Sequence, residues 1–187
     1  MPRLHILLDS PATNELTKTE LDIGIVSQPY VIIAHCIRAG FCVSHALREW
    51  VCLTIGFDAL GPYSLTLDPT TIRYMGTDER SILHIILRAQ ISQRQRKTKV
   101  PYGVSISEEP IEDMITTFLE SKTSLLIPNQ IETWKDEQAK LSKIAMYCPL
   151  FDDWDSSSFQ AESLLSYSGQ IPRDVAILEV VHALDAL

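Results

Sequence analysis

The apolar run at residues 50–57, WVCLTIGF, constrains the fold of this chain more than any other segment. It is almost uninterrupted by polar residues, and Val51, Thr54 and Ile55 are β-branched. Such runs are typical of inner strands whose two faces are both covered, as in parallel sheets. The run therefore predicts a sheet lying between two layers of helices.

The rest of the chain alternates between strand-like and helix-like segments. Strands are expected at residues 3–8, 61–67, 123–128 and 143–150, with a loop or short strand at 101–107. Helices are expected at residues 30–48, 77–92, 110–121, 132–143 and 172–187, and residues 11–28 form a polar connection. This order predicts an α/β fold with a mainly parallel sheet and helices on both faces, built as a single domain over 1–187.

Composition narrows the class of protein. The chain is 45% hydrophobic and 21% charged, which is typical of a globular domain, and no apolar run approaches the roughly 20 residues that cross a bilayer. The cysteines lack CxxC spacing, and His35 beside Cys36 has no partner at a metal-ligand spacing. We therefore expect buried free thiols in a cytoplasmic protein, with no metal site and no membrane partner.

Common catalytic motifs are missing from the sequence. It contains no P-loop, GxGxxG, GxSxG or HExxH pattern, and only 7 glycines. The acidic neighbours at 108–109 and 152–153 are adjacent along the chain, which is more typical of solvated loops than of an acid–base pair. Short motifs alone do not identify an activity.

The start of the helix expected at 77–92 is the densest cluster of chemical groups. Either Thr77 or Asp78 can serve as the N-cap, and Glu79 and Arg80 follow in the first turn. A strand followed by a charged helix start is where α/β folds often place anion-binding and catalytic groups. Asp78 and Arg80 are therefore candidate catalytic residues, with a helix cap and an intrahelical ion pair as the alternative interpretation.

A basic segment follows on the same helix, in a chain whose net charge is −8. The sequence RAQISQRQRKTK contains no acidic residue, and its cations are Arg88, Arg94, Arg96, Lys97 and Lys99. Cations are common at helix C-termini, so the segment could be a solvated helix end. The other interpretation is a patch that contacts RNA phosphates.

Three stretches in succession carry a resemblance to a known family. They are HCIRAGFCVSHALREWVCLTIGF, LDPTTIRYMGTDERSILHIILRAQ and VPYGVSISEEPIEDMITTFLE, and together they cover about residues 30–120. The steps that match are a Ser-His-x-Ile-Arg helix end, a DERS helix start and a Pro-Gly turn, met by Ser44, His45, Leu47 and Arg48, by Asp78, Glu79, Arg80 and Ser81, and by Pro101, Gly103, Val104 and Ser105. In these features the chain resembles the archaeal tRNA pseudouridine N1-methyltransferases, which are SPOUT enzymes with a trefoil knot.

The resemblance implies a fold, a cofactor and a substrate. It implies a knot region at about residues 123–187, S-adenosylmethionine as methyl donor, and tRNA or another structured RNA as partner. The cofactor would lie between the ends of two knot strands, against Pro128, Asn129 and Gln130 on one side and Tyr147, Cys148, Pro149 and Leu150 on the other. An alternative alignment makes CPLFDDW the first knot loop. Arg80 would orient the base or a phosphate, and Asp78 would hold Arg80 or accept a hydrogen bond.

The chain also departs from the family pattern. Pro-Asn-Gln-Ile stands where a Gly-Asp-His type of loop is expected, Gln28-Pro29-Tyr30 replaces a Gly-Arg step, and a segment of 21 residues, FDDWDSSSFQAESLLSYSGQI, is inserted. Proline removes a backbone donor that a cofactor could use. A protein of the same fold that has lost its cofactor site, and binds RNA or dimerises, is therefore an alternative. An α/β domain of unrelated function is a third.

The C-terminal helix predicts a homodimer. It carries more apolar side chains than one sheet face needs, namely Val175, Ile177, Leu178, Val181, Leu184 and Leu187. An exposed apolar stripe of this kind usually finds a partner.

Overall fold

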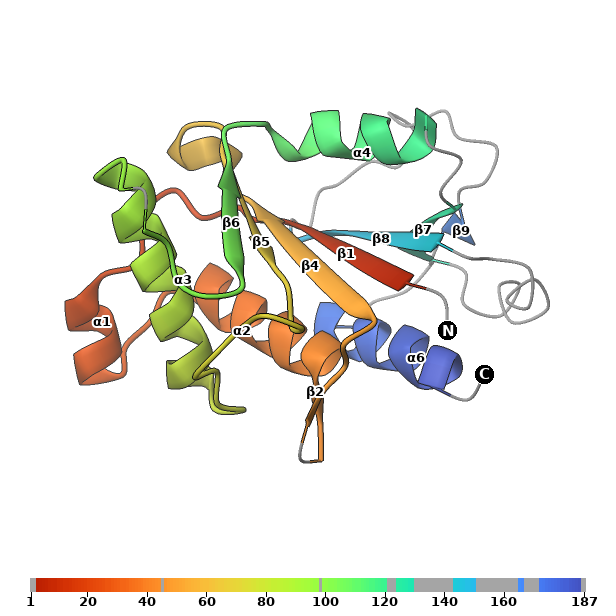
Figure 1. Ribbon diagram of the computed structural model, residues 1–187, viewed down its shortest axis with the longest axis horizontal. Helices are drawn as coiled ribbons and strands as arrows, with labels where there is room; N and C mark the ends of the chain where they lie inside the picture. Colours follow the sequence, from red (N-terminus) through yellow and green to blue (C-terminus); the bar gives the residue numbers. More distant parts are fainter. Residues whose placement is uncertain are drawn as a thin grey trace.

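The computed structural model describes residues 3–44, 46–97, 99–120, 124–129, 143–150, 165–166 and 172–185. Within these residues one sheet of seven strands forms the centre of the molecule, in the order β6-β5-β4-β1-β8-β7-β9 (Figure 1). The strands are β1 (Arg3–Asp9), β4 (Val51–Gly56), β5 (Ser64–Leu67), β6 (Val104–Ser107), β7 (Ser124–Asn129), β8 (Lys143–Pro149) and β9 (Leu165–Ser166).

Strand β1 is the central strand of the sheet, and it pairs in parallel with a strand on each side. Leu4 to Asp9 pair with Val51 to Gly56 of β4, and Arg3 to Asp9 pair with Lys143 to Pro149 of β8. β7 continues the parallel part next to β8, and β9 pairs in parallel with β7. On the other side β5 pairs antiparallel with β4, and β6 with β5. The predicted mainly parallel sheet is confirmed.

Helices cover both faces of the sheet, as predicted. In Figure 1, α4 (Ile111–Glu120) lies on one face, and α2 (Gln28–Phe41) and α6 (Arg173–Asp185) lie on the other. α3 (Glu79–Arg94) flanks the β6 end of the sheet, with α1 (Lys18–Ile23) beside it. β4 is buried along almost its whole length, which accounts for its apolar sequence. Among the described residues, no helix is long and apolar enough to span a membrane.

Gly40 and Arg48 fix the position of α2 against the sheet and against α6. A Cβ atom on Gly40 would come within 2.9 Å of Ile6 Cδ1, so this position lets α2 approach the sheet closely. Arg48 is buried and donates to the carbonyl oxygens of Ala39, Gly40 and Cys42, which satisfies the C-terminal end of α2. It also pairs with Asp185 at 2.9 Å, which joins α2 to the last turn of α6.

Two expected elements differ from the structure. The helix expected at 30–48 begins at Gln28 and ends at Phe41, after which β2 (Cys42–Val43) and β3 (Ala46–Leu47) form a short antiparallel hairpin. The polar connection at 11–28 contains α1, because Thr17 and Glu20 form a complete capping box. The helix expected at 132–143 and the path of the predicted knot lie outside the described residues, so the knot stays a prediction.

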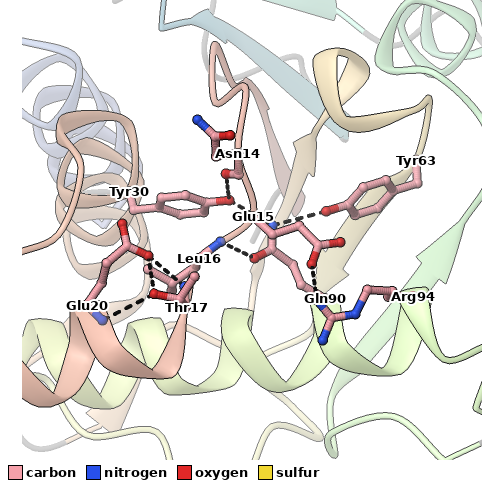
Figure 2. Close-up of polar contacts among 9 residues, drawn as sticks. All are labelled: Asn14, Glu15, Leu16, Thr17, Glu20, Tyr30, Tyr63, Gln90 and Arg94. Carbon is pink, nitrogen blue, oxygen red and sulfur yellow. Dashed lines mark hydrogen bonds and ion pairs between the residues drawn. The ribbon is translucent and has the colours of Figure 1, made fainter.

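The buried side chain of Gln90 holds α3 against the body of the fold (Figure 2). Its Oε1 accepts the backbone N–H of Leu16 at 3.1 Å, and its Nε2 donates to the hydroxyl groups of Tyr30 and Tyr63, each at 3.0 Å. Tyr30 in turn donates to the carbonyl oxygen of Asn14 at 2.8 Å. One amide thus joins α3 to the segment after β1, to α2 and to the residue preceding β5.

Replacing this amide with an apolar group of similar size should destabilise the protein. In Gln90→Leu the N–H of Leu16 and the hydroxyl of Tyr63 lose the hydrogen bonds that Gln90 supplies inside the protein, so we expect the free energy of unfolding to fall by about 2–4 kcal/mol. Urea denaturation measures the change. Gln93→Leu, a half-buried position on the same helix, is the control and should change stability much less. Equal effects of the two substitutions would contradict this role.

Candidate functional site

A groove of about 810 Å³ runs along α3. One wall is α3 itself, and the other walls are the segments 73–78 and 97–102. Its cationic lining residues are Arg73, Arg80, Arg88, Lys97 and Lys99, and the only carboxylate among its lining residues is that of Asp78. A groove with this excess of positive charge suits a polyanion.

Backbone hydrogen bonds hold the first residues of the segment between β5 and α3 in place. The N–H of Asp68 donates to the carbonyl oxygen of Gly103 at 2.8 Å, and the N–H of Ile72 donates to the carbonyl oxygen of Asp68 at 2.9 Å. Gly103 has φ 76°, and a Cβ there would collide with the backbone of Ile72. This position therefore requires glycine, and the two loops that flank the groove touch along their backbones.

The end of α3 brings two lysines back over the groove. Arg96 adopts φ 47°, and the N–H of the next residue, Lys97, donates to the carbonyl oxygen of Ser92 at 2.9 Å. This bond resembles the reversal that commonly ends a helix. The hydroxyl of Ser92 contacts the carbonyl oxygens of Arg88 and Lys99, so the returning chain is held beside the helix.

The structure brings three of the five predicted RNA-binding cations into the groove. Arg88, Lys97 and Lys99 line it. Arg94 instead pairs with Glu15 at 2.9 Å, and Arg96 occupies the turn that ends α3; neither of these two lines the groove. All five stay predictions as RNA contacts, and the geometry favours the first three.

Asp78 and Arg80, the predicted catalytic residues, both line the groove. Asp78 is the N-cap of α3, and its Oδ1 accepts the N–H of Ser81 at 2.9 Å, which decides between the two cap candidates. Arg80 lies 3.3 Å from Asp22 of α1, and both side chains are largely exposed. An exposed ion pair contributes little to stability, so Arg80 can exchange Asp22 for a phosphate at small cost.

Sequence inspection missed three groove residues, Arg73, Tyr74 and Tyr102. Tyr74 is 88% exposed, and the guanidinium of Arg73 lies 5.0 Å from the centre of the Tyr102 ring. The signal was present in the sequence, because the steps TIRYMG and KTKVPYG place aromatic residues among the cations. Interleaved cations and aromatics are typical of surfaces that bind nucleic acid.

The predicted cofactor residues gather at a different place, the carboxyl edge of the parallel strands. Because β7 and β8 run parallel, Pro128 and Asn129 end at the same edge as Pro149 and Leu150. The N–H of Leu150 donates to the carbonyl oxygen of Asp9, so the end of β1 lies there too. Gln130 lies outside the described residues. The carboxyl edge of an open parallel sheet is where α/β proteins usually bind their ligands.

Three of these cofactor candidates have buried side chains. Tyr147 is 2% exposed, Leu150 is 8% exposed, and Cys148 is fully buried. Burial raises the pKa of the Cys148 thiol to about 12, so this cysteine is a neutral core residue. The side chain of Cys148 is therefore enclosed in the core, and the hydroxyl of Tyr147 forms a hydrogen bond with Asp9.

Tyr147 holds the carboxylate of Asp9 at this edge. Its hydroxyl donates to Asp9 Oδ2 at 3.0 Å. Burial raises the pKa of Asp9 to about 6, against the opposing effect of the Tyr147 hydrogen bond, and the negative charges of Asp58 and Glu112 add to the rise. Carboxyl groups of Asp9, Asp58 and Glu112 thus influence one another at this edge, where Arg173 also acts on Cys148, whereas the groove on α3 is lined mainly by cations.

Within one chain the structure does not bring the two predicted sets together. β5, which leads into the groove, and β8, which carries cofactor candidates, are separated by β4 and β1. At the usual spacing between strands this corresponds to about 14 Å. A substrate that reaches both places must extend beyond a single nucleotide.

The titration of Asp9 should make stability fall as pH rises. The folded carboxyl keeps its proton up to about pH 6, whereas the unfolded one loses it near its ordinary value of 3.8, so the unfolding free energy decreases between these values. We expect Asp9→Asn to gain stability relative to the parent from about pH 4 to about pH 7, by roughly 2 kcal/mol. Urea denaturation across this range measures the gain, and a constant difference between the two proteins would contradict it.

Residues 18–146, more than half of the chain, match the family model described as "Putative SAM-dependent RNA methyltransferase". The crystal structure of Archaeoglobus fulgidus Nep1 bound to S-adenosylhomocysteine has a similar fold, with a TM-score of 0.60 at 9% sequence identity. The match covers 100% of this chain and 98% of the Nep1 chain. No curated protein sequence matches.

These findings confirm the predicted fold class and the predicted methyl donor. At 9% identity the likeness to Nep1 establishes the SPOUT-type fold alone. The family match establishes the reaction class and its cofactor, S-adenosylmethionine. The matched residues include helices α1 to α4 and every residue that lines the groove. The chain therefore belongs to the SAM-dependent RNA methyltransferase family.

Proposed function

We propose that this protein methylates a pseudouridine at N1 in tRNA or another structured RNA, and that the groove on α3 binds the RNA. The observation that carries the proposal is the groove itself, lined by five cations in a chain of net charge −8. Protein cations that contact RNA phosphates displace the counterions bound there, and the release of these counterions favours binding. A cluster of cations in an otherwise acidic protein therefore indicates an RNA-binding surface.

The carboxyl edge of β1, β8 and β7 fits the methyl donor. When bound, S-adenosylmethionine supplies an electrophilic methyl group on a positively charged sulfur. Asp9 lies at this edge, and the charges of Asp58 and Glu112 act on it, so the edge favours a cation. The ends of β7 and β8, at Asn129 and Pro149, would bound the donor, as the resemblance to the archaeal enzymes implies.

Arg80 and Asp78 would act on the RNA. Arg80 is held loosely by Asp22 and can turn to a phosphate of the RNA, which would position a strand whose target base extends to the carboxyl edge. Asp78 keeps Arg80 in place through the start of α3, since its carboxylate caps the helix that carries Arg80. The N1 proton of the target base would pass to water, and the carbon–sulfur bond of the donor would break as the nitrogen–carbon bond forms, releasing S-adenosylhomocysteine; Arg80 would contribute by positioning the RNA for this step.

A second candidate function rests on a specific observation at the carboxyl edge. Pro128 and Pro149 stand near the ends of both predicted cofactor strands, and neither has a backbone N–H to offer a ligand. A protein that keeps the basic groove but no longer binds the methyl donor would be an RNA-binding partner without activity.

Calorimetry with the methyl donor and transfer of its labelled methyl group decide between these functions. We expect S-adenosylmethionine to bind, and RNA that contains pseudouridine to be labelled. Arg80→Ala should lower the rate of transfer at least about tenfold, because it removes a charge that acts only on the RNA, while donor binding stays as in the parent. Lys18→Ala, an exposed cation on α1 outside the groove, is the control. Folded protein that binds RNA but gives no heat with the donor would favour the second function.

We also propose that the protein is a homodimer through α6, with a smaller contact than the sequence suggested. Ile177, Val181 and Leu184 are fully buried inside the chain, in the same core as the residues of α2. The apolar residues that α6 leaves at the surface include Val175, which is 37% exposed, and Leu178, which is partly buried. A dimer would use this outer side of the helix.

Light scattering tests the dimer. The parent should have twice the chain mass of 21.1 kDa, and Val175→Glu should shift it to the monomer because a charge would then be buried in the contact. Ile25→Glu, at a 71% exposed position before α2, should leave the mass unchanged. A parent protein that is monomeric at micromolar concentration would overturn the proposal.

A further inference from the structure

Two exposed tyrosines, Tyr74 and Tyr102, line the groove, and phosphate binding alone does not require them. Tyr74 comes from the loop between β5 and α3, and Tyr102 comes from the loop between α3 and β6. Both are exposed, at 88% and 61%. Large aromatic side chains are usually buried, and exposed aromatics in a basic groove are therefore informative.

Tyr74 is held in a backbone conformation that tyrosine seldom adopts. Its φ is 63°, in the left-handed region that glycine and asparagine occupy most easily. Such a conformation costs free energy and persists only where neighbouring contacts impose it. In this conformation the Tyr74 ring lies at the surface of the groove, where 88% of the residue is exposed.

The contacts that impose this conformation lie on both sides of Tyr74. Before it, Thr70 donates its N–H and its hydroxyl to Asp68 Oδ1, at 2.9 Å and 2.6 Å. After it, the N–H of Gly76 donates to Ser81 Oγ at 2.7 Å, which ties the loop to the first turn of α3. Hydrogen bonds thus hold both ends of the loop, and Tyr74 lies between these two ends.

Tyr102 already has a cation on one face. The Arg73 guanidinium lies 5.0 Å from the ring centre, which is within the range of a cation–π contact. Tyr102 is nevertheless 61% exposed, so another flat group can reach it. A nucleobase stacked there would complete a sandwich of guanidinium, ring and base.

We infer that the groove binds an unpaired stretch of RNA, with bases stacked on Tyr74 and Tyr102 and phosphates on Arg88, Lys97 and Lys99. The inference rests on the proposed function and specifies the form of RNA that the groove takes. Bases inside a duplex are stacked on one another and cannot reach these rings, whereas unpaired bases can turn toward them. The two tyrosines therefore select single-stranded or loop segments, and the cations supply affinity without regard to base pairing.

Fluorescence anisotropy with three labelled RNAs tests the inference: a single strand, the same strand in a duplex, and a hairpin whose loop carries the strand. The ring deletions are Tyr102→Ala and Tyr74→Asn, the second because asparagine accepts a positive φ. Tyr102→Phe and Tyr74→Phe keep the rings, and Lys18→Ala is a cation control outside the groove. Thermal melting checks that each variant is folded.

The parent should bind the single strand and the hairpin at least about tenfold more tightly than the duplex. Each ring deletion should weaken binding of the unpaired RNAs about tenfold and leave binding of the duplex unchanged, and the phenylalanine variants should bind like the parent. Lys97→Ala should instead weaken binding of all three RNAs and reduce the dependence of affinity on salt.

Equal affinity for duplex and single strand, or ring deletions that bind like the parent, would overturn the inference. An absence of RNA binding would overturn it as well. Calorimetry with S-adenosylmethionine alone, on the same variants, separates this from the proposed methyl transfer. If the ring deletions bind unpaired RNA like the parent while the parent binds the donor, the stacking inference fails and the proposed methyl transfer stands. If the parent selects unpaired RNA through its rings but binds no donor, the proposed methyl transfer fails and the stacking inference stands.

Discussion

The side-chain amide of Gln90 is the interaction on which the position of α3 depends, and the groove depends on α3. The amide is buried, and it accepts from Leu16 and donates to Tyr30 and Tyr63, so its partners come from three different parts of the chain. A buried amide is stable only when its hydrogen bonds are made, and it therefore fixes the helix at one place. The basic side of α3 is presented to solvent as a consequence.

The molecule has two chemically opposite sites on one sheet. The groove beside β5 and β6 is cationic, and carboxyl groups lie at the carboxyl edge of β1 and β8, where burial and nearby carboxylates raise the pKa of Asp9 to about 6. An RNA phosphate is attracted to the first and repelled by the second, whereas a sulfonium is attracted to the second. In the proposed function, this charge separation would direct the RNA and the methyl donor to different parts of the sheet.

The sequence predicted the layers of the fold because apolar periodicity depends on local packing. The strand at 50–57, the helix at 77–92 and its two possible caps were all anticipated, and the structure selects Asp78 as the cap. α1 was missed because a helix of 6 residues has too few turns to show a period, and the hairpin at 42–47 was read as helix because its apolar residues continue the spacing of α2. The steps TIRYMG and KTKVPYG carry a signal for aromatics among cations, but the sequence could not show that Tyr74 and Tyr102, which lie on two different loops, line one groove. The apolar stripe of α6 was recognised, but the sequence could not show that α2 and the sheet would bury most of it.

Photochemical cross-linking tests the central claim, that RNA lies in the groove along α3, most directly. A single-stranded RNA that contains 4-thiouridine would be irradiated with the protein, and the attached peptides would be identified by mass spectrometry. We expect cross-links in the two loops that carry Tyr74 and Tyr102, which flank the groove on different segments of the chain. Cross-links confined to the hairpin at 42–47 or to α6, with none between residues 68 and 102, would contradict the account.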